Sequence, residues 1–186
     1  MNKKQTAITV LLLSLMFLLA ISQGFFVDNF SRVRISENSH QFKEYAFEEY
    51  SIEFPEEWTI DEKENKDGYI SYNINFKSKD NATSGLVQVI NSQKDVRNYA
   101  EADLNKQSLE YYNNEIMPFE DSESIGVLSK YNTNIKDGYS YINECYYIKG
   151  TNGQIIKVLF NISKNSYSKE TEDICLKIAS SIKQNK

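Results

Sequence analysis

The chain has 186 residues, of which 26 are acidic and 21 are basic, and its formal net charge is −5. At about 100–200 residues per domain, this length fits one domain with an appendage. Apolar residues make up 40% of the chain, which is enough for a folded core, and the acidic balance leaves no basic face for nucleic acid. A single histidine and two cysteines exclude a His-rich or Cys-rich metal centre and a disulfide scaffold.

The N-terminal segment contains Lys3 and Lys4, followed by a run over residues 7–27 that holds no charge. A helix over this run spans a hydrocarbon core about 30 Å thick. Because the lysines precede the run, we predict a single-pass anchor at 7–27 in the cell membrane, with residues 1–6 in the cytoplasm and the rest outside. The alternative is a signal peptide cleaved near Ser22, which would release a secreted protein. Bulky residues around that position favour the anchor.

Residues 28–44 are mostly polar and show no clear period, so we assign them to a stalk that precedes a domain at 45–186. His40, the one histidine, falls in this stalk. A Ser-His-Asp or Cys-His site would have to use it, so the domain itself has no histidine base. Without residues 1–27 the chain keeps 19 basic and 26 acidic residues, a net charge of −7 that anionic lipid headgroups would repel.

Alternating apolar and polar side chains predict a short strand over residues 50–54. The same pattern predicts further strands at 58–60, 69–76, 86–90, 125–134, 139–149 and 154–163. The pairs Asp137-Gly138 and Asn152-Gly153 favour type I′ turns, so we expect the last three strands to form an antiparallel meander.

Two segments have the period of a helix. Residues 96–113 repeat apolar positions four apart after Asp95, and residues 168–183 follow the good N-cap Ser168. The apolar stripe of the second helix consists of Ile174, Cys175, Ile178, Ala179 and Ile182. This order of strands, helix, meander and helix predicts an α+β fold, with an antiparallel β-sheet covered by helices.

The motif Phe54-Pro55-x-x-Trp58, at the end of the first predicted strand, resembles the opening of PsbP-like domains. The hairpin over 138–163 and the closing helix over 168–183 are similar to the C-terminal half of that family. The resemblance therefore follows the order of elements through the whole predicted domain, and it implies a structural role for the three motif residues.

PsbP-like domains have a three-layer α/β/α sandwich around an antiparallel sheet, and the resemblance implies this fold for residues 45–186. Such domains act mostly as non-catalytic binding or assembly factors, among them extrinsic subunits of photosystem II and a Ran-binding relative. The resemblance thus implies a domain that is not an enzyme. No partner is transferred from the family, because one fold hosts many functions.

Acidic side chains gather in the 53–67 region and could supply the paired carboxylates of a cell-envelope hydrolase. No spacing singles out a pair, and Lys63 stands where a calcium loop needs a ligand. A solvated charged turn is the favoured interpretation, with no metal and no cofactor expected.

The two cysteines lie in different predicted elements, Cys145 in a strand and Cys175 on the stripe of the last helix. A disulfide between them is chemically possible outside the cell. The strict geometry that it requires favours two buried thiols instead.

Tyr146 and Tyr147 are the candidate residues for a binding surface. They are adjacent in a strand and therefore point to opposite faces, so one of them is available to bind a glycan or a partner strand unless helices cover both. An aromatic core is the interpretation that the 13 tyrosines favour.

Two functions remain at this point. The first is a membrane-anchored extracytoplasmic domain without catalysis, which binds or assembles an envelope protein or a glycan and contacts the membrane through its N-terminal helix. The second is a cell-envelope hydrolase that uses carboxylates of residues 53–67. A pocket with two inward carboxylates would favour the enzyme, and a filled sheet face would favour binding.

Overall fold

The computed structural model describes residues 40–63, 68–106, 110–121, 124–135 and 138–185. Of the two units into which the chain divides, Met1–Asn38 and Ser39–Lys186, the second contains every described residue. The anchor predicted at 7–27 and the cleavage site near Ser22 lie outside the described residues. Across the described ranges, no helix is long and apolar enough to cross a membrane.

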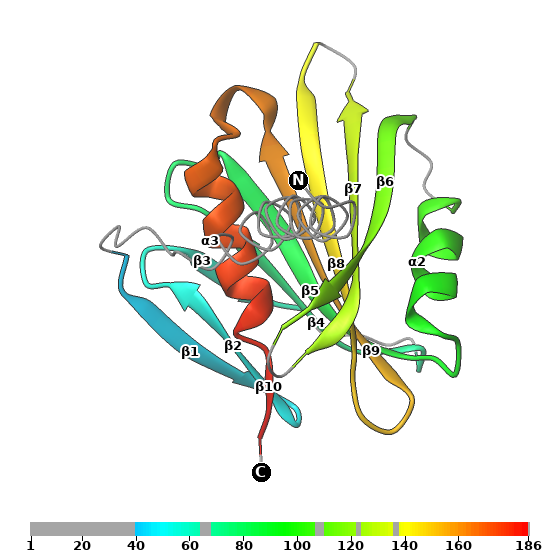
Figure 1. Cartoon of the computed structure of the whole chain (residues 1–186). Helices are drawn as coiled ribbons and strands as arrows, with labels where there is room; N and C mark the ends of the chain where they lie inside the picture. The colour runs from blue at the N-terminus through cyan, green and yellow to red at the C-terminus, as the bar shows by residue number, and fades with distance from the viewer. Residues whose placement is uncertain (1–39, 64–67, 107–109, 122–123, 136–137, 186) are drawn as a thin grey trace, which may run out of the picture. The chain divides into compact units, whose positions relative to one another are not determined.

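A seven-stranded antiparallel sheet forms the body of the second unit (Figure 1). Its strands, in spatial order, are β3 (Thr59–Glu62), β4 (Ile70–Lys77), β5 (Thr83–Asn91), β9 (Gln154–Ser163), β8 (Ser140–Lys149), β7 (Ile125–Asn134) and β6 (Tyr111–Glu120). The predicted meander is present as β7, β8 and β9. Asn152 and Gly153 both have positive φ, at 52° and 75°, as the predicted type I′ turn requires.

A second sheet contains β1 (Phe42–Phe47), β2 (Tyr50–Pro55) and β10 (Lys183–Gln184), in the order β1-β2-β10. The strand predicted at 50–54 is therefore present, but its two neighbours were missed. Residues 42–44, which we assigned to the stalk, belong to β1 and pair with β2, so the fold begins before residue 45. Only one residue of β1 is fully buried, which is why the segment lacks the alternation that marks a strand.

Helix α2 (Val96–Leu104) is shorter than the helix predicted over 96–113, because the chain continues as strand β6. Tyr111 extends the four-residue spacing of the helix, but it lies in β6 and packs against Tyr131 of β7, with ring centroids 5.9 Å apart. A helix and the strand that follows it can bury side chains in one core. The spacing of apolar residues therefore does not mark the boundary between them.

Both helices begin at the predicted caps. The Asp95 carboxylate accepts a hydrogen bond from the backbone N–H of Arg97 at 3.0 Å, at the start of α2. The Ser168 hydroxyl accepts one from the backbone N–H of Thr171 at 3.2 Å, at the start of α3 (Lys169–Ser180). Local sequence determines these boundaries, because each cap satisfies N–H groups that have no partner within the helix.

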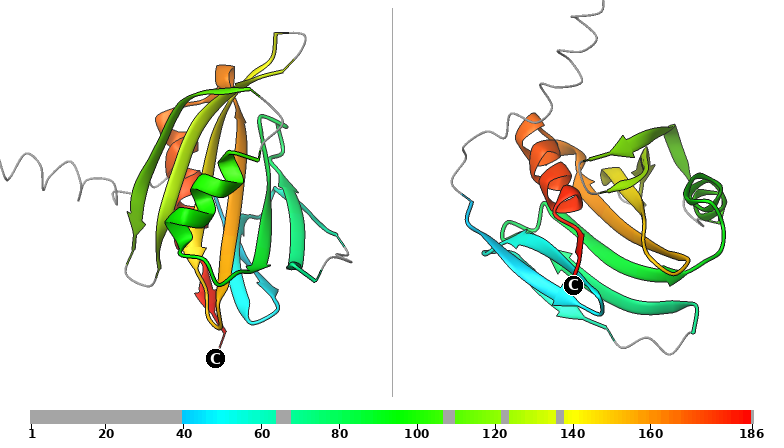
Figure 2. Two further views of the ribbon diagram at one scale, coloured as in Figure 1. Left: turned by 90° about the vertical axis from the view of Figure 1, so that its right-hand side faces the viewer. Right: turned by 60° about the horizontal axis from the view of Figure 1, so that its bottom comes forward.

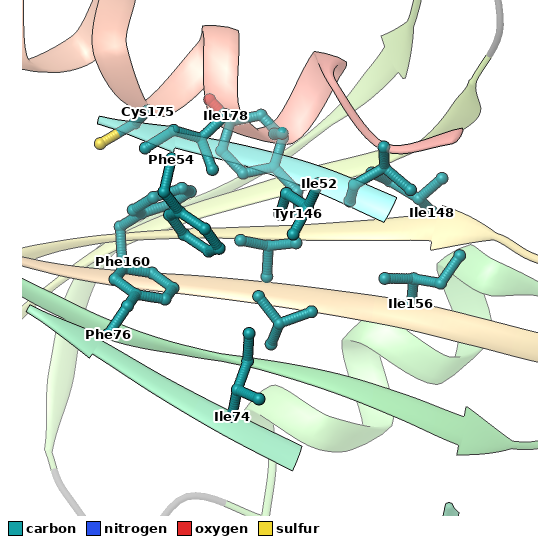
Figure 3. Close-up of a cluster of buried hydrophobic side chains, with 14 of the residues drawn as sticks. Ile52, Phe54, Ile74, Phe76, Tyr146, Ile148, Ile156, Phe160, Cys175 and Ile178 are labelled. Carbon is teal, nitrogen blue, oxygen red and sulfur yellow. The ribbon is translucent and has the colours of Figure 1, made fainter. Parts of the chain in front are cut away.

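The larger core lies between the seven-stranded sheet, helix α3 and the three-stranded sheet (Figure 3). Alternate side chains of β8 and β9, among them Tyr146 and Phe160, meet Phe54 of β2 and Ile178 of α3 in this core. The predicted stripe of α3 faces it, and Cys175 and Ile178 are fully buried.

The opposite side of the seven-stranded sheet, which we call the α2 face, is covered in part by helix α2 (Figure 2). Tyr99, Ala100 and Leu104 of α2 pack against Tyr147 and Ile155 of the sheet. The domain is therefore the predicted α+β sandwich, with one helix on each face of an antiparallel sheet. The separate three-stranded sheet is an addition that the sequence did not reveal.

Candidate functional site

The motif residues Phe54, Pro55 and Trp58 have a structural position. Phe54 and Pro55 are buried at the end of β2, and the backbone N–H of Trp58 donates to the carbonyl oxygen of Pro55 at 3.0 Å. The ring of Phe76 lies 5.1 Å from that of Phe54 and 5.7 Å from that of Trp58, centroid to centroid. The motif thus packs into the core between the two sheets.

Cys145 and Cys175 are buried free thiols. Cys145 points from β8 to the α2 face, whereas Cys175 packs in the core on the other side of the sheet. The sheet separates them, so this fold does not allow a disulfide between them. Burial raises the pKa of the Cys145 thiol to about 11, which leaves it protonated at neutral pH and a poor nucleophile.

Tyr146 and Tyr147 do not form the binding surface that we suggested. Both are only 1% exposed, because the two faces of β8 are both covered. Tyr146 meets Phe119 edge-on with ring centroids 5.1 Å apart, and the Tyr147 hydroxyl donates to Asp103 Oδ2 at 2.7 Å. The exposed tyrosines are instead Tyr69, Tyr112 and Tyr139.

The described carboxylates of the 53–67 region form separate surface contacts. Glu57 lies 2.6 Å from His40 Nδ1, and Asp61 pairs with Lys63 at 2.6 Å. His40 therefore contacts the folded domain and is not a free stalk residue. Among the described residues, no group of three or more His, Cys, Asp or Glu side chains could hold a metal ion. The carboxylates of this region that the structure describes therefore give the hydrolase hypothesis no converging pair.

An open cavity of about 570 Å³ lies on the α2 face, in the part of the sheet that α2 leaves uncovered. It is lined by Ser84, Lys106, Tyr131, Thr133, Ile135, Tyr141, Asn143, Lys157, Leu159 and Asn161. A helix rises about 1.5 Å per residue and a strand about 3.3 Å per residue. The nine residues of α2 are therefore much shorter than the ten residues of β7, β8 or β9, and the strands extend beyond the helix and leave the cavity open.

The register of the sheet places four polar side chains in one row of this cavity. Ser84 of β5 pairs with Asn161 of β9, Asn161 with Asn143 of β8, and Asn143 with Tyr131 of β7. Paired residues in an antiparallel sheet share a face, so all four point to the α2 face. Amides are uncommon on a largely buried sheet face, and this row therefore marks the cavity as a candidate site.

Asn143 stands within the row and is only 3% exposed. Its Nδ2 donates to Thr133 Oγ1 at 3.0 Å and to the carbonyl oxygen of Tyr131 at 3.2 Å. Among the described residues, its Oδ1 accepts no hydrogen bond, and the side chains of Ser84 and Asn161 make none. The cavity thus contains polar groups whose hydrogen-bonding capacity is open to a ligand.

Lys157 and Asp103 form an ion pair at the border between the cavity and α2. Lys157 Nζ lies 2.6 Å from Asp103 Oδ2, the same oxygen that accepts from Tyr147. Burial alone would lower the pKa of Lys157, but the neighbouring Cys145 and the Asp103 carboxylate, which also accepts a hydrogen bond from the lysine, together outweigh burial and raise the pKa above its ordinary value. The lysine is therefore charged at neutral pH, and the pair holds α2 against the sheet.

The cavity can bind a polar molecule, but its lining offers no catalytic set. The described lining residues supply amides, hydroxyls and two lysines, without a histidine, cysteine or carboxylate. A nucleophile with a general base, or a pair of carboxylates, is therefore not assembled there. Its volume falls within the range of about 300–1,000 Å³ that is usual for small-ligand sites.

The cavity was not predicted from the sequence. Asn143 lies two residues from Cys145, and Asn161 lies two residues from Leu159, so each amide shares a strand face with an apolar residue. A polar residue on an otherwise apolar strand face was the sequence feature that could have indicated the cavity. It does not show that the two amides are neighbours, because that depends on the register of β8 against β9.

The described domain places an antiparallel sheet between two helices, with the Phe54-Pro55-x-x-Trp58 motif at the end of β2. The solved structure of cyanobacterial PsbP (CyanoP) from Synechocystis sp. PCC 6803 aligns with a TM-score of 0.55 at 8% identity, covering 82% of this chain and 98% of that chain. The predicted PsbP-like fold is thereby confirmed.

A crystal structure from Bacteroides thetaiotaomicron aligns at 14% identity, covering 78% of this chain and 49% of that chain. Its TM-score of 0.45 is too low to show a shared fold. No family model and no curated protein matches the chain. The likeness to CyanoP therefore concerns the fold alone.

Proposed function

We propose that the protein is a non-catalytic binding domain, held at the outer face of the cell membrane by a helix over residues 7–27, and that the cavity on the α2 face binds a glycan of the cell envelope. The uncharged run after Lys3 and Lys4 supports the tether. The PsbP-like fold supports a binding or assembly role over an enzymatic one.

The observation that carries this proposal is a set of three polar groups in an open cavity that make no hydrogen bond to the described residues: Asn143 Oδ1 and the side chains of Ser84 and Asn161. A sugar hydroxyl can donate to Asn143 Oδ1 and accept from the amide of Asn161, which suits a ligand that is both donor and acceptor. Tyr141 on the cavity wall offers an aromatic ring, and Tyr139 in the adjacent turn is 66% exposed. Sugar rings pack on such aromatic faces.

Co-sedimentation with purified insoluble peptidoglycan tests the proposal. The full chain in neutral detergent micelles is expected to sediment with the polymer. Asn161→Ala removes one or two hydrogen bonds and is expected to weaken binding about tenfold, at about 0.5–1.5 kcal/mol per bond. Asn75→Ala is the matched control, because Asn75 belongs to strand β4 of the same sheet, does not line the cavity and is also half-buried.

The same assay separates the two functional hypotheses. Release of soluble sugar by the wild-type chain would support a hydrolase and contradict a purely binding role. Equal sedimentation of Asn161→Ala and Asn75→Ala would show that the cavity is not the site. Failure of the wild-type chain to sediment would contradict glycan binding itself.

A further inference from the structure

The charge of the cavity differs in sign from that of the protein. The chain has more acidic than basic residues, yet the charged side chains of the described cavity lining are Lys106 and Lys157. Asp103 balances Lys157 at 2.6 Å. Lys106 is exposed and has no ion-pair partner among the described residues. Among the described residues, no carboxylate therefore compensates the charge that Lys106 brings to the cavity, in a protein with a net charge of −5.

The positive charge and the hydrogen-bonding groups come from different elements. Lys106 follows helix α2, whereas Asn143 and Asn161 belong to strands β8 and β9 of the sheet. Asn143 is 3% exposed, so its unused Oδ1 can be reached only by a small group that enters the cavity. A ligand that contacts both the two asparagines and Lys106 needs hydroxyls that face the sheet and an anionic group that faces the end of α2.

We propose that the cavity selects an acidic sugar: a polyhydroxylated ligand with one carboxylate or phosphate, whose anionic group pairs with Lys106 and whose hydroxyls bind Asn143 and Asn161. This rests on the proposed function and narrows its glycan to an anionic one. A lysine is a compact charge that suits either anion, and a charge-assisted hydrogen bond is about twice as strong as a neutral one. The acidic surface elsewhere repels such ligands, which concentrates binding at the cavity.

Titrations with two matched pairs of sugars test this inference. N-acetylmuramic acid against N-acetylglucosamine tests a carboxylate, and glucose 6-phosphate against glucose tests a phosphate. The side-chain amide signals of Asn143 and Asn161 in the full chain, in neutral micelles, report occupancy of the cavity by NMR. The acidic member of at least one pair is expected to bind about tenfold more tightly, with an advantage that shrinks as salt is added.

Variants of Lys106 separate charge recognition from the rest of the site. Lys106→Met is expected to reduce the affinity for the acidic sugar to that of its neutral partner, while the neutral affinity stays unchanged. Lys106→Arg is expected to restore the difference. Lys94→Met is the matched control, because Lys94 is also exposed but does not line the cavity.

The outcomes are distinct. Equal affinity for the acidic and neutral member of both pairs overturns the selection for an anion and leaves the proposed glycan binding in place. A preference for the acidic sugar that persists in Lys106→Met overturns the pairing with Lys106. Absence of amide shifts with all four sugars overturns this inference together with the proposed function.

Discussion

The alternation of strand β8 determines the chemistry of the two cysteines. Cys145 and Tyr147 point to the α2 face, and Tyr146 between them points to the opposite core. Cys175 lies in that opposite core. The two thiols are therefore kept apart by the sheet, and this holds even in an oxidising compartment that permits disulfides.

We expect both thiols to resist iodoacetamide in the native chain and to react fully after denaturation. Burial removes access, and it holds the pKa of Cys145 at about 11, so little thiolate is present at mildly alkaline pH. Mass spectrometry of the non-reduced full chain counts the alkyl groups in both states. A mass lower by two hydrogens, from a disulfide, or rapid labelling of native Cys145 would contradict the fold.

Gly85 of β5 occupies a position where an added methyl group does not fit. Its Cβ would lie 1.9 Å from the carbonyl oxygen of Leu159 and 2.4 Å from the ring of Phe76. We expect Gly85→Ala to lower the free energy of unfolding by about 3 kcal/mol, because neither neighbour can move freely. Urea unfolding of the full chain in micelles, followed by the fluorescence of Trp58, measures the loss.

Gly68→Ala is the control for this change, since its Cβ would meet nothing within 4 Å. It is expected to unfold at nearly the wild-type urea concentration. If Gly85→Ala and Gly68→Ala unfolded at the same urea concentration, the close approach of β5 to its neighbours would be refuted.

At the scale of elements, a buried charge network joins helix α3 to strands β7 and β8. Glu144 of β8 is fully buried, lies 3.0 Å from Lys130 Nζ of β7 and accepts a hydrogen bond from the Tyr167 hydroxyl at 3.0 Å. Lys130 also donates to Tyr167 and lies 3.2 Å from Glu172 of α3. Lys130 is thus the cation that two carboxylates share.

We expect Lys130→Met to destabilise the fold by about 3–5 kcal/mol, because it leaves Glu144 buried without its cation. Lys169→Met is the control. Lys169 pairs with Glu172 and Asp173 on the exposed side of α3, and its loss should cost no more than about 0.5–1 kcal/mol. Thermal unfolding of the full-length variants measures both, and similar melting temperatures would argue against a stabilising role of the buried network.

The same network predicts the pH range of stability. Burial by itself would raise the pKa of Glu172, but the charges of Lys130 and Lys169 outweigh it and hold the pKa below its ordinary value of 4.5. Burial by itself would lower the pKa of Lys130, but hydrogen bonding to Tyr167 and the Glu144 charge raise it above 10.5. Both shifts stabilise the folded state between these two ordinary values.

The sign of each shift determines where this stabilisation is lost. The carboxyl contribution disappears as the pH falls below 4.5 through the lowered pKa of Glu172, and the lysine contribution disappears as the pH rises above 10.5 through the raised pKa of Lys130. Melting temperatures of the full chain across this range should form a plateau that falls at both ends. Lys130→Met should flatten both falls, and an unchanged profile would contradict the assignment.

At the scale of the whole molecule, the predicted tether would insert into the membrane, whereas the acidic domain would be repelled by it. Without residues 1–27 the chain has a net charge of −7, so an anionic bilayer repels the domain. Membrane association would therefore depend on the apolar run over residues 7–27.

We expect the full chain to remain in the membrane fraction after washing with high salt, because hydrophobic insertion is not screened by ions. Replacing Leu13 and Phe17 by lysine is expected to release it, since each central lysine costs about 2.5–3.5 kcal/mol in the bilayer. Immunoblotting of membrane and soluble fractions measures both. A soluble wild-type protein whose N-terminus lies near Ser22 would identify a cleaved signal peptide instead.

Much of the fold could be predicted because it depends on neighbouring residues. Ser168 caps α3 through the N–H group of a residue three positions along, and Asn152 and Gly153 adopt the positive φ angles that their own residue types favour. Strand β1 and the end of helix α2 could not be predicted. Each depends on packing against segments far along the chain, which local spacing does not reveal.

The sequence by itself indicated the class of fold and limited the histidine and cysteine side chains available for catalysis to one and two, respectively, because residue counts, capping residues and the Phe54-Pro55-x-x-Trp58 motif can be read without knowing the tertiary structure. Only the tertiary structure decided the site. It buried Tyr146 and Tyr147, separated the two cysteines and aligned Asn143 with Asn161 beneath an open cavity. The physical reason is that the face and the partner of a strand residue are set by the register between strands, which is a long-range property of the sheet.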